Sequence, residues 1–282
     1  MAAAVRARLP ILYHYLPTPV PYKPALELQE RLHQLQLATR RRQSHSQNSS
    51  LNEEGNKTHP DILLLLQHRP VYTGGRRQQQ WTDELELEQK RLQHLGADWV
   101  PTARGGETTF HGPGQIVAYP LFDLGRMSRS IRCYIDDLQS IMQQHVTITH
   151  RISTTPSSLT GVFVTPTSKI GSIGVQVRHR LTTHGLSLNI TPEPLAWFDQ
   201  VVACGLPGVR QTSIGAELGR EVRIENEIAP LVERFGRGFQ REMRPVLEDE
   251  EPEVYAMIRE LEILGENAGP WLSGPLLSPP TS

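Results

Sequence analysis

The sequence predicts an α+β protein, a mixed β-sheet domain with flanking helices. Two observations support this class. Stretches typical of strands do not alternate regularly with stretches typical of helices, which argues against a doubly wound parallel sheet. In addition, Lys169–Val177 and Leu181–Ile190 flank a short basic turn and can pair as an antiparallel hairpin. An antiparallel pair among irregularly placed strands and helices indicates a mixed sheet.

The bulk composition excludes several function classes. The 282 residues carry a formal net charge of −1, so no general attraction to nucleic acid or to an anionic membrane is expected. No apolar run reaches the length of a membrane span. Two cysteines do not make a disulfide framework and suit a reducing compartment. No histidine stands in a His-Glu-x-x-His or Cys-x-x-Cys spacing, so we expect no metal site.

The first part of the chain contains a predicted helix, a polar insertion and a buried strand. Residues 1–10 are expected to form an N-terminal extension, and the lack of acidic residues before Glu27 suggests an organelle-targeting segment. Ala25–Leu37 is predicted to be a helix with a leucine-rich side. Residues 39–60 are polar and without periodicity, which predicts a surface insertion that is a loop or disordered. Asp61–Gln67 is apolar and is predicted to be a strand.

The middle of the chain adds two helices and two strands. Thr82–His94 is predicted to be a charged amphipathic helix that ends at a glycine. Ala97–Thr102 and Gln115–Tyr119 are rich in β-formers and are predicted to be strands. Ser130–His145 is predicted to be a helix, and Cys133 lies off its apolar stripe, as a packing or surface residue. The stripe consists of Ile131, Ile135, Leu138 and Met142.

The last part of the chain completes a single predicted domain. Gly161–Thr165 is predicted to be a short strand that precedes the hairpin. Helices are expected within Glu221–Met243 and at Pro252–Leu264. The proline-rich tail, residues 267–282, is expected to be disordered. Residues 11–266 are therefore predicted to form one domain.

A glycine-rich stretch, Arg104–Pro120, is predicted to form one wall of a binding site. Its first eleven residues contain four glycines and a proline, so a plain helix or strand is excluded there. Glycine allows the backbone to approach a ligand closely, and polar residues accompany the glycines along the bend. A decorated hairpin loop without a ligand is the alternative interpretation. The accompanying polar residues are Arg104, Thr108, Thr109, His111 and Gln115.

Two further residues have chemistry to offer. Cys204 follows an apolar run and precedes Gly205, so its thiol is expected at the end of a strand, although a cysteine alone is more typical of a buried structural position. Lys169 stands in a glycine-spaced, β-branched segment, whereas nearly all other basic residues are arginines. Arginine cannot release a proton, so lysine at this position indicates an amine that does. A solvated surface lysine is an equally good interpretation from the residue type alone.

Three segments in this order resemble the lipoyl(octanoyl) transferase family, which consists of octanoyl-acyl-carrier-protein:protein N-octanoyltransferases. Arg104–Gln115 is similar to the family's Arg-Gly-Gly…His-Gly-Pro-Gly-Gln segment, Lys169–Val175 to its Lys-Ile-x-x-Ile-Gly-Val segment, and Cys204–Gly205 to its Cys-Gly turn. The likeness spans roughly Ile11–Arg244. It implies the fold that the family shares with biotin and lipoate protein ligases.

The resemblance also implies which residues form the site. It identifies Cys204 as the acyl-accepting nucleophile and Lys169 as its acid–base partner. His111 and His184 are implied to be structural or to position substrate. The substrate-binding residues implied by the matching segments are Arg104, Gly105, Gly106, Thr108, Thr109, Phe110, His111, Gly112, Gln115, Ser172, Ile173, Gly174, His184, Gly185 and Leu186.

The implied reaction is transfer of an octanoyl group from octanoyl-acyl carrier protein to a lysine of a lipoyl domain, through a thioester on Cys204. Conversion of a thioester to an amide is downhill, so no ATP and no cofactor are implied. The partners are the carrier protein and the lipoyl domains of lipoate-dependent enzyme complexes, the expected location is the mitochondrion, and nothing requires more than a monomer. A basic patch at Arg76–Arg77 or Arg178–Arg180 is expected to dock the acidic partners. A closed slot lined by residues such as Phe110, Val162 and Phe163 is expected to favour eight-carbon chains.

Three alternatives stay open at the level of sequence. An ATP-dependent lipoate or biotin protein ligase would share the glycine-rich turn and a lysine, but it would leave the Cys-Gly turn without a use. A non-catalytic module that binds acyl carrier protein would keep the scaffold and predict binding without turnover. A catalytic triad of Cys204, a histidine and an acid is the third alternative.

Overall fold

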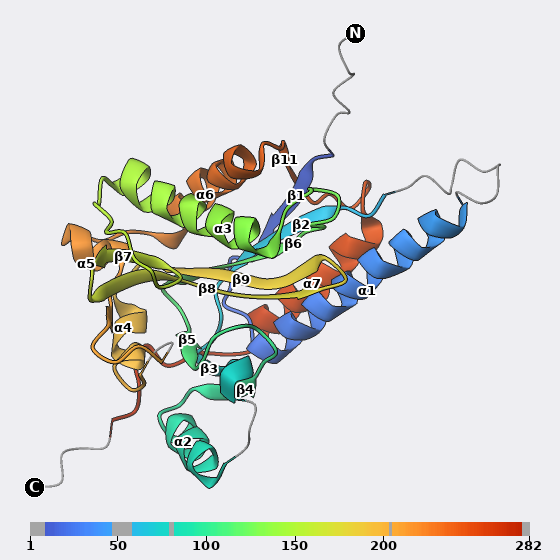
Figure 1. The fold of residues 1–282 in the computed structure, drawn as a ribbon. Helices are drawn as coiled ribbons and strands as arrows, with labels where there is room; N and C mark the ends of the chain where they lie inside the picture. The colour runs from blue at the N-terminus through green and yellow to red at the C-terminus, as the bar shows by residue number, and fades with distance from the viewer. Residues whose placement is uncertain (1–8, 47–57, 79–81, 203–204, 278–282) are drawn as a thin grey trace, which may run out of the picture.

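The computed structural model describes residues 9–46, 58–78, 82–202 and 205–277. Most strands belong to one large mixed sheet, and Figure 1 shows helices on both of its faces. The prediction of an α+β fold with a mixed sheet is confirmed. In chain order the strands of the large sheet are β1 (Ile11–Tyr15), β2 (Asp61–Leu66), β6 (Gln115–Leu121), β7 (Val162–Thr165), β8 (Ser168–Arg178), β9 (Leu181–Asn189), β10 (Arg210–Gln211) and β11 (Met243–Pro245).

The strand order of the large sheet is β10-β8-β9-β6-β2-β1-β11, with β7 paired to β8. Strands β8 and β9 form the predicted antiparallel hairpin, in which Gly174 lies opposite Gly185. Strand β1 is parallel to both β2 and β11, whereas β2, β6, β9 and β8 are successively antiparallel. The fully buried apolar strand β2 lies inside the sheet, as its sequence predicts.

A second, smaller sheet consists of β3 (Val71–Gly74), β4 (Asp98–Pro101) and β5 (Thr109–His111). Strand β3 pairs parallel with β4 and antiparallel with β5. The glycine-rich stretch therefore leaves β4, contributes β5 to the small sheet and ends in β6 of the large sheet. This path differs from a simple hairpin loop, because the two flanking strands belong to different sheets.

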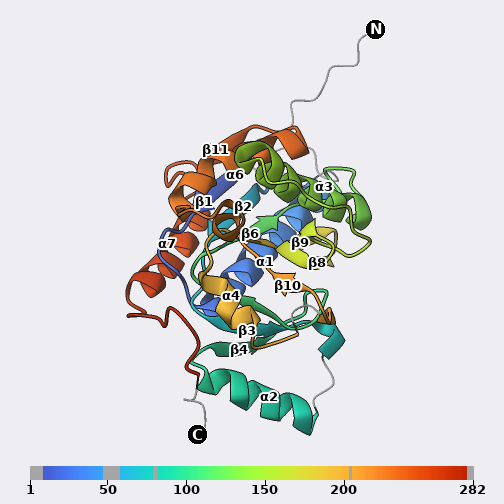
Figure 2. The same ribbon diagram turned by 90° about the vertical axis from the view of Figure 1, so that its left-hand side faces the viewer.

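The helices cover the large sheet in two layers, as Figures 1 and 2 show. On one face, α3 and α6 pack over a core that includes Leu138, Leu231 and Phe235. On the other face, α1 and α7 pack over a core that includes Leu32 and Ile258. The helical elements are α1 (Tyr22–Ser46), η2 (Arg76–Gln78), α2 (Asp83–His94), α3 (Ile131–Gln144), the π-helical turn η3 (His145–Thr149), α4 (Glu193–Phe198), α5 (Ile214–Leu218), α6 (Ile224–Phe239) and α7 (Pro252–Glu266).

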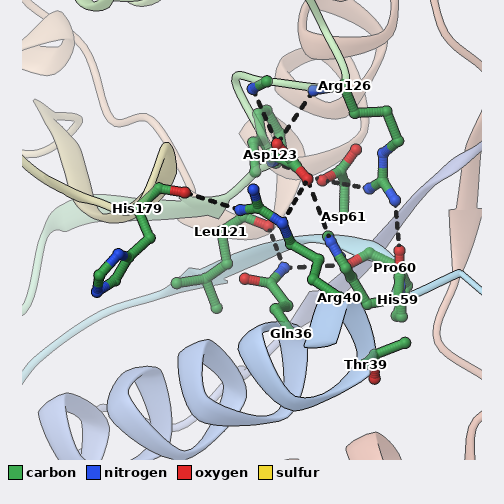
Figure 3. A network of polar contacts seen from close by, with 12 residues as sticks. Gln36, Thr39, Arg40, His59, Pro60, Asp61, Leu121, Asp123, Arg126 and His179 are labelled. Atoms are coloured by element: carbon green, nitrogen blue, oxygen red, sulfur yellow. Dashed lines mark hydrogen bonds and ion pairs between the residues drawn. The ribbon is translucent and has the colours of Figure 1, made fainter. Parts of the chain in front are cut away.

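Helix α1 is longer than its sequence predicts. It continues to Ser46, so the prediction of a loop is wrong for residues 39–46, while residues 47–57 lie outside the described part of the chain. Figure 3 shows the contacts that hold this part of the helix against the sheet. The amide of Gln36 donates to the carbonyl oxygens of Pro60 and Leu121, at 3.0 and 2.9 Å, and Arg40 donates to that of His179 at 2.7 Å.

The tail is also more ordered than its composition predicts. Residues 267–277 run along the small sheet, and the prediction of disorder is wrong for them; residues 278–282 lie outside the described part. The guanidinium of Arg69 donates to the carbonyl oxygens of Gly269 and Pro270, at 2.7 Å each. The N–H of Leu276 donates to the carbonyl of Leu95 at 2.9 Å. These polar contacts to the backbone do not depend on apolar periodicity, so the sequence does not reveal them.

The predicted apolar stripe of α3 is partly wrong. Leu138 and Met142 are buried, but Ile131 is 50% exposed. Tyr134 and Ile141 complete the buried face instead. They directly precede Ile135 and Met142 of the predicted stripe in the sequence. Cys133 is exposed, as predicted. Within the described ranges, no helix has the length and apolarity needed to cross a membrane.

Candidate active site

The glycine-rich stretch and the β8–β9 hairpin meet where both contain glycine. The N–H of Gly105 donates to the carbonyl of Val175 at 3.0 Å. A side chain at Gly174 would begin 3.1 Å from Cδ of Arg104 and 3.2 Å from the carbonyl oxygen of Gly105, closer than most such contacts. Two segments that are about seventy residues apart in the sequence therefore form one continuous wall.

Arg104 fixes the shape of the glycine-rich bend. It is buried, and one guanidinium nitrogen donates to both the carbonyl and the hydroxyl oxygen of Thr73, at 2.7 and 2.6 Å. The other terminal nitrogen donates to the carbonyl oxygens of Gly105 and Glu107, at 3.1 and 3.0 Å. Arg104 thus ties the bend to strand β3, and its role is to position the bend as well as to line the site.

A cavity of about 590 Å³ opens between these segments, the first turn of α3 and the loop before β7. One side is polar and is formed by residues such as Thr109, His111 and His184. The other side is apolar and is formed by Ile135, Leu159 and other residues. The full set that lines the cavity is Tyr22, Arg77, Arg104, Gly105, Gly106, Glu107, Thr109, His111, Ile131, Ile135, Ser158, Leu159, Thr160, Lys169, Ser172, Ile173, Gly174, Val175, His184, Gly185, Ser187 and Leu206.

Lys169 lies in this cavity and is only 3% exposed, so it is not a solvated surface lysine. Its Nζ lies over the ring of Phe163, 5.4 Å from the ring centroid. Gly161 approaches it from β7's side: a methyl group there would lie 2.5 Å from Cε of Lys169. With a φ of +125°, Gly161 also holds a backbone conformation that other residues rarely adopt.

The imidazoles beside the cavity are neutral at physiological pH. Burial lowers the pKa of His111 to about 4, and burial together with Arg104 lowers that of His184 to about 3. His68, behind His111, is also buried, and burial lowers its pKa to about 3. No carboxylate pairs with these three imidazoles in the described part of the chain. The imidazoles of this part of the wall therefore present uncharged hydrogen-bonding groups to the cavity.

A chain of hydrogen bonds connects His111 to the strand that carries Lys169. Asn189 donates from Nδ2 to the carbonyl of Thr212 at 2.9 Å, so its Oδ1 is left to accept from Gln115 Nε2 at 2.8 Å. Gln115 must then accept through Oε1 from His111 Nδ1, at 2.6 Å. The proton of His111 is thereby assigned to Nδ1, and its Nε2 carries a lone pair. Thr212 in turn donates its N–H to the carbonyl of Lys169 at 2.8 Å.

Two polar atoms of the cavity wall keep spare hydrogen-bonding capacity. Oγ1 of Thr109 and Nδ1 of His184 are buried and have no hydrogen-bond partner among the described residues. Both residues line the cavity and are at most 5% exposed. They are therefore placed to hydrogen-bond a polar atom of a bound substrate.

The turn after β9 and α4 reaches the cavity next to Glu107. Gly205 has a φ of +63°, and a side chain there would collide with the carboxylate of Glu107, 1.8 Å from its Oε2. The carboxylate also pairs with Arg77 at 3.5 Å. Leu206 lines the cavity. Cys204 lies outside the described residues, so its predicted place stays a prediction, but its described neighbour Gly205 is pressed against the glycine-rich bend.

Most of the predicted site residues gather in the cavity. Five do not line it. Phe110 packs with Tyr72 and Trp197 in a separate cluster, and Leu186 belongs to the main core. Thr108 and Gly112 lie on the bend behind the wall, and Gln115 orients His111. Those that do line the cavity are Arg104, Gly105, Gly106, Thr109, His111, Lys169, Ser172, Ile173, Gly174, His184 and Gly185.

The prediction of a slot lined by Phe110, Val162 and Phe163 is wrong. None of the three lines the cavity: Val162 is buried in the core, and Phe163 faces Lys169. The apolar lining includes Ile173, which was predicted, and Val175 and Leu206. It also includes Ile131, Ile135 and Leu159, which were not predicted as site residues. Ile131 and Ile135 could have been identified from the sequence, because the apolar stripe of α3 begins at these two residues. An apolar stripe that is longer than the part buried in the core indicates a further apolar contact.

A family profile adds an independent observation. Residues 41–236 match the lipoyl protein ligase A/B catalytic domain. The chain belongs to this family. Among members of the lipoyl protein ligase A/B family, a zebrafish (Danio rerio) protein named octanoyl-acyl-carrier-protein:protein N-octanoyltransferase LIPT2, mitochondrial, is 41% identical over 181 residues, 64% of this chain and 78% of that protein. The protein of the same name from the frog Xenopus tropicalis is 42% identical, over 61% of this chain and 70% of that protein.

More distant relatives cover more of the chain. A protein named octanoyltransferase from the bacterium Caldicellulosiruptor saccharolyticus is 34% identical over 237 residues, 83% of this chain and 92% of that protein. Among solved structures, lipoate-protein ligase A bound with ATP has a TM-score of 0.58 at 15% identity, over 90% of this chain and 95% of that one. A bi-partite lipoate protein ligase from Thermoplasma acidophilum has a TM-score of 0.56 at 15% identity, over 91% and 93%. These structures confirm the lipoate protein ligase-like fold of the lipoyl protein ligase A/B family.

Proposed function

We propose that this protein transfers an octanoyl group from octanoyl-acyl carrier protein to a lysine of a lipoyl domain, in the mitochondrion. The relatives named as octanoyltransferases support the reaction, and the mitochondrial names of the fish and frog proteins support the location. The observation that carries the proposal is the burial of Lys169 in a cavity whose wall is the glycine-rich bend. A buried amine that lines a cavity is suited to proton transfer rather than to solubility.

The proposed mechanism has two half-reactions with Cys204 as the nucleophile. In the first, Lys169 takes the proton of the Cys204 thiol, the thiolate attacks the thioester carbonyl, and the carrier thiol leaves with a proton from Lys169. In the second, the amine of the acceptor lysine attacks the octanoyl-cysteine, Lys169 takes its proton, and Cys204 leaves and is reprotonated. The sum exchanges a thioester for an amide and a thiol, so no ATP enters.

Several features of the described residues support this mechanism. Gly205 and Leu206, which directly follow Cys204, contact the glycine-rich bend or line the cavity that contains Lys169. Backbone N–H groups of this turn, or of the bend at Gly105–Gly112, are candidates to stabilise the oxyanion. The neutral imidazoles of His111 and His184 position the acyl group without competing for the thiol proton.

The proposed docking surface for the acidic partners is Arg76–Arg77. Arg77 lies at the cavity edge and is exposed, and its partner Glu107 is held loosely at 3.5 Å. The alternative patch is less free, because Arg178 pairs with Glu30 and Arg180 donates to the carbonyl oxygens of Leu124 and Arg129. An acidic surface that replaces Glu107 at Arg77 would be guided to the cavity mouth.

The proposal is tested by intact mass spectrometry of the full chain after mixing with octanoyl-acyl carrier protein, without ATP. An octanoyl adduct is expected on the wild type, and it should disappear when a lipoyl domain is added. Cys204→Ser should abolish the adduct, while Cys133→Ser, which changes the exposed cysteine of α3, should keep it. Lys169→Arg should slow adduct formation by about 100- to 10,000-fold, because it keeps the charge but loses the acid–base function.

The outcomes separate the alternatives. Acyl transfer that requires ATP and magnesium would make the protein a ligase. Binding of the carrier protein without an adduct or transfer would make it a binding module. If Lys169→Arg is acylated at the wild-type rate, the lysine only positions substrate and the dyad is wrong.

A further inference from the structure

A π-helical turn at the end of α3 brings two histidines onto one carboxylate. In an α-helix, residues five apart point about 140° away from each other, because each residue turns the chain by about 100°. The turn η3, His145–Thr149, is π-helical, and hydrogen bonds from i to i+5 place His145 and His150 on the same side. Their ring centroids are 5.5 Å apart.

Glu227 lies in the first turn of α6, and one of its carboxylate oxygens contacts both imidazoles. Oε2 lies 2.8 Å from Nε2 of His145 and 2.7 Å from Nε2 of His150. The side chains are 0%, 6% and 4% exposed for His145, His150 and Glu227. Burial raises the pKa of Glu227, but the hydrogen bonds from the two histidines overcome this and lower it to about 2. The group is therefore a buried carboxylate anion.

Glu227 differs from other buried carboxylates in its ionic partners. Asp61 pairs with Arg126 and Arg241, and Glu262, which His14 contacts through one imidazole, also pairs with Arg259. In the described part of the chain no arginine or lysine pairs with Glu227; its ionic partners are the two imidazoles. A divalent cation held by the carboxylate and by both imidazole nitrogens would compensate this buried charge.

We propose that His145, His150 and Glu227 form a binding site for a divalent cation of the zinc class. The three ligand atoms lie within 4.8 Å of one another, and two nitrogens with one carboxylate oxygen form a donor set that zinc and neighbouring transition metals accept. To bind the cation through Nε2, each imidazole must be neutral and carry its proton on Nδ1. For His145 this is inexpensive, because its buried Nδ1 has no hydrogen-bond partner among the described residues in either tautomer.

The site would join the two helices that cover one face of the sheet. His145 and His150 follow α3, whose opposite end contributes Ile131 and Ile135 to the cavity, and Glu227 belongs to α6. The cation would therefore stabilise the α3–α6 layer without touching Lys169. The expected role is structural, and the expected readout is binding and thermal stability rather than turnover.

The test uses the untagged full chain after treatment with a chelator. Zn²⁺ is titrated by calorimetry and Co²⁺ by visible absorption, which reports tetrahedral nitrogen and oxygen ligands without any variant. One equivalent of each ion is expected to bind, and Zn²⁺ should raise the melting temperature. His150→Gln and Glu227→Gln should each weaken Zn²⁺ binding by more than about 100-fold. Loss of a partner that only hydrogen-bonds to a metal ligand weakens binding by about 10- to 100-fold.

His14→Gln is the matched control, since it removes the imidazole of a histidine–carboxylate pair that has no second histidine. It should bind Zn²⁺ as the wild type does. His150→Gln keeps the His145–Glu227 hydrogen bond and so is expected to fold, which circular dichroism checks. A wild-type chain that binds no stoichiometric Zn²⁺ or Co²⁺ overturns the proposal, as does a folded His150→Gln variant with unchanged affinity.

Discussion

Two buried polar regions of the same sheet are built in opposite ways. At the end of α1, Asp61 pairs with Arg126 and Arg241. Asp123 lies near His59 and Arg40 in the same network (Figure 3). Beside the cavity, the imidazoles are paired with amides, hydroxyls and carbonyls instead. In the first region buried charges pair with one another, whereas burial keeps the histidines beside the cavity uncharged. The charged groups of the cavity wall are held separately, since Arg104 donates to backbone carbonyls and Glu107 pairs with Arg77.

The pKa values follow the same division. Burial raises the pKa of Asp123, but hydrogen bonds from His59 and the backbone of Arg126 overcome burial and lower it to about 2. Burial lowers the pKa of His111 to about 4 without a carboxylate to oppose it. Asp123 in the first region thus stays charged and His111 in the second stays neutral through the physiological pH range. The substitutions below test this difference.

The largest effect is expected from Asp61→Asn in the charged region. The carboxylate is fully buried, and removing its charge leaves Arg126 and Arg241 without their anion. Breaking a buried pair of this kind typically lowers the free energy of unfolding by about 3–5 kcal/mol. Urea unfolding measures it, and Glu260→Gln, which breaks the exposed pair with Arg31, is the control that should change little. Equal effects of the two variants would contradict the assignment of a compensated interior.

Gln115→Glu would introduce a charge into the neutral region. The new carboxylate accepts from Nδ1 of His111 and favours its imidazolium form, so the pKa of His111 should rise from about 4 by about 1–3 units. NMR titration of the imidazole protons measures the pKa, and acyl transfer should slow because a charge now faces the cavity. Gln144→Glu, on the exposed side of α3, should change neither quantity. An unchanged His111 pKa would mean that the Gln115 contact does not hold the tautomer.

The smallest effect of a single substitution is expected near neutral pH and concerns the pH dependence of stability. His68, His111 and His184 have folded pKa values of about 3–4, below the unfolded value of about 6.5. Below about pH 6.5 these histidines bind protons in the unfolded chain but not in the folded chain. The free energy of unfolding therefore decreases as the pH falls, by about 1.4 kcal/mol per pH unit for each histidine. This loss ends only near the folded pKa values.

His184→Gln should therefore reduce the slope of unfolding free energy against pH by about one proton between about pH 6.5 and 5. Urea unfolding at a series of pH values measures the slope. Gln144→Ala, which removes an exposed uncharged side chain of α3, is the control and should leave the slope unchanged. A slope that His184→Gln does not alter would show that this imidazole titrates alike in the folded and unfolded chains.

The fold was predictable where local pattern and tertiary environment agree. The alternating strands of the hairpin at Gly174 and Gly185, and the fully apolar β2, were identified for this reason. The end of α1 was not, because Gln36 and Arg40 hold it by polar bonds to strands that are distant in the sequence. The same explanation applies to the docked tail.

The site was predictable to the extent that its motifs are local. The glycine-rich bend and Lys169 lie together as the segments imply. Ile131 and Leu159 were missed because a helix end and a loop reach the cavity only through the packing of α3 on the sheet. The trio of His145, His150 and Glu227 was invisible to spacing rules, because its geometry depends on a π-helical turn.

The docked tail has a consequence for how the protein is made. Arg69 donates hydrogen bonds to the carbonyl oxygens of Gly269 and Pro270, and it lies just before β3 in the sequence. Thr73 of β3 accepts hydrogen bonds from Arg104. Residues 269–276 leave the ribosome after every other element of the described fold. Of the described elements, this bracing tail is therefore made after the strands of the large sheet and after the α3–α6 layer. The glycine-rich bend should accordingly gain its support later than the core that carries Lys169.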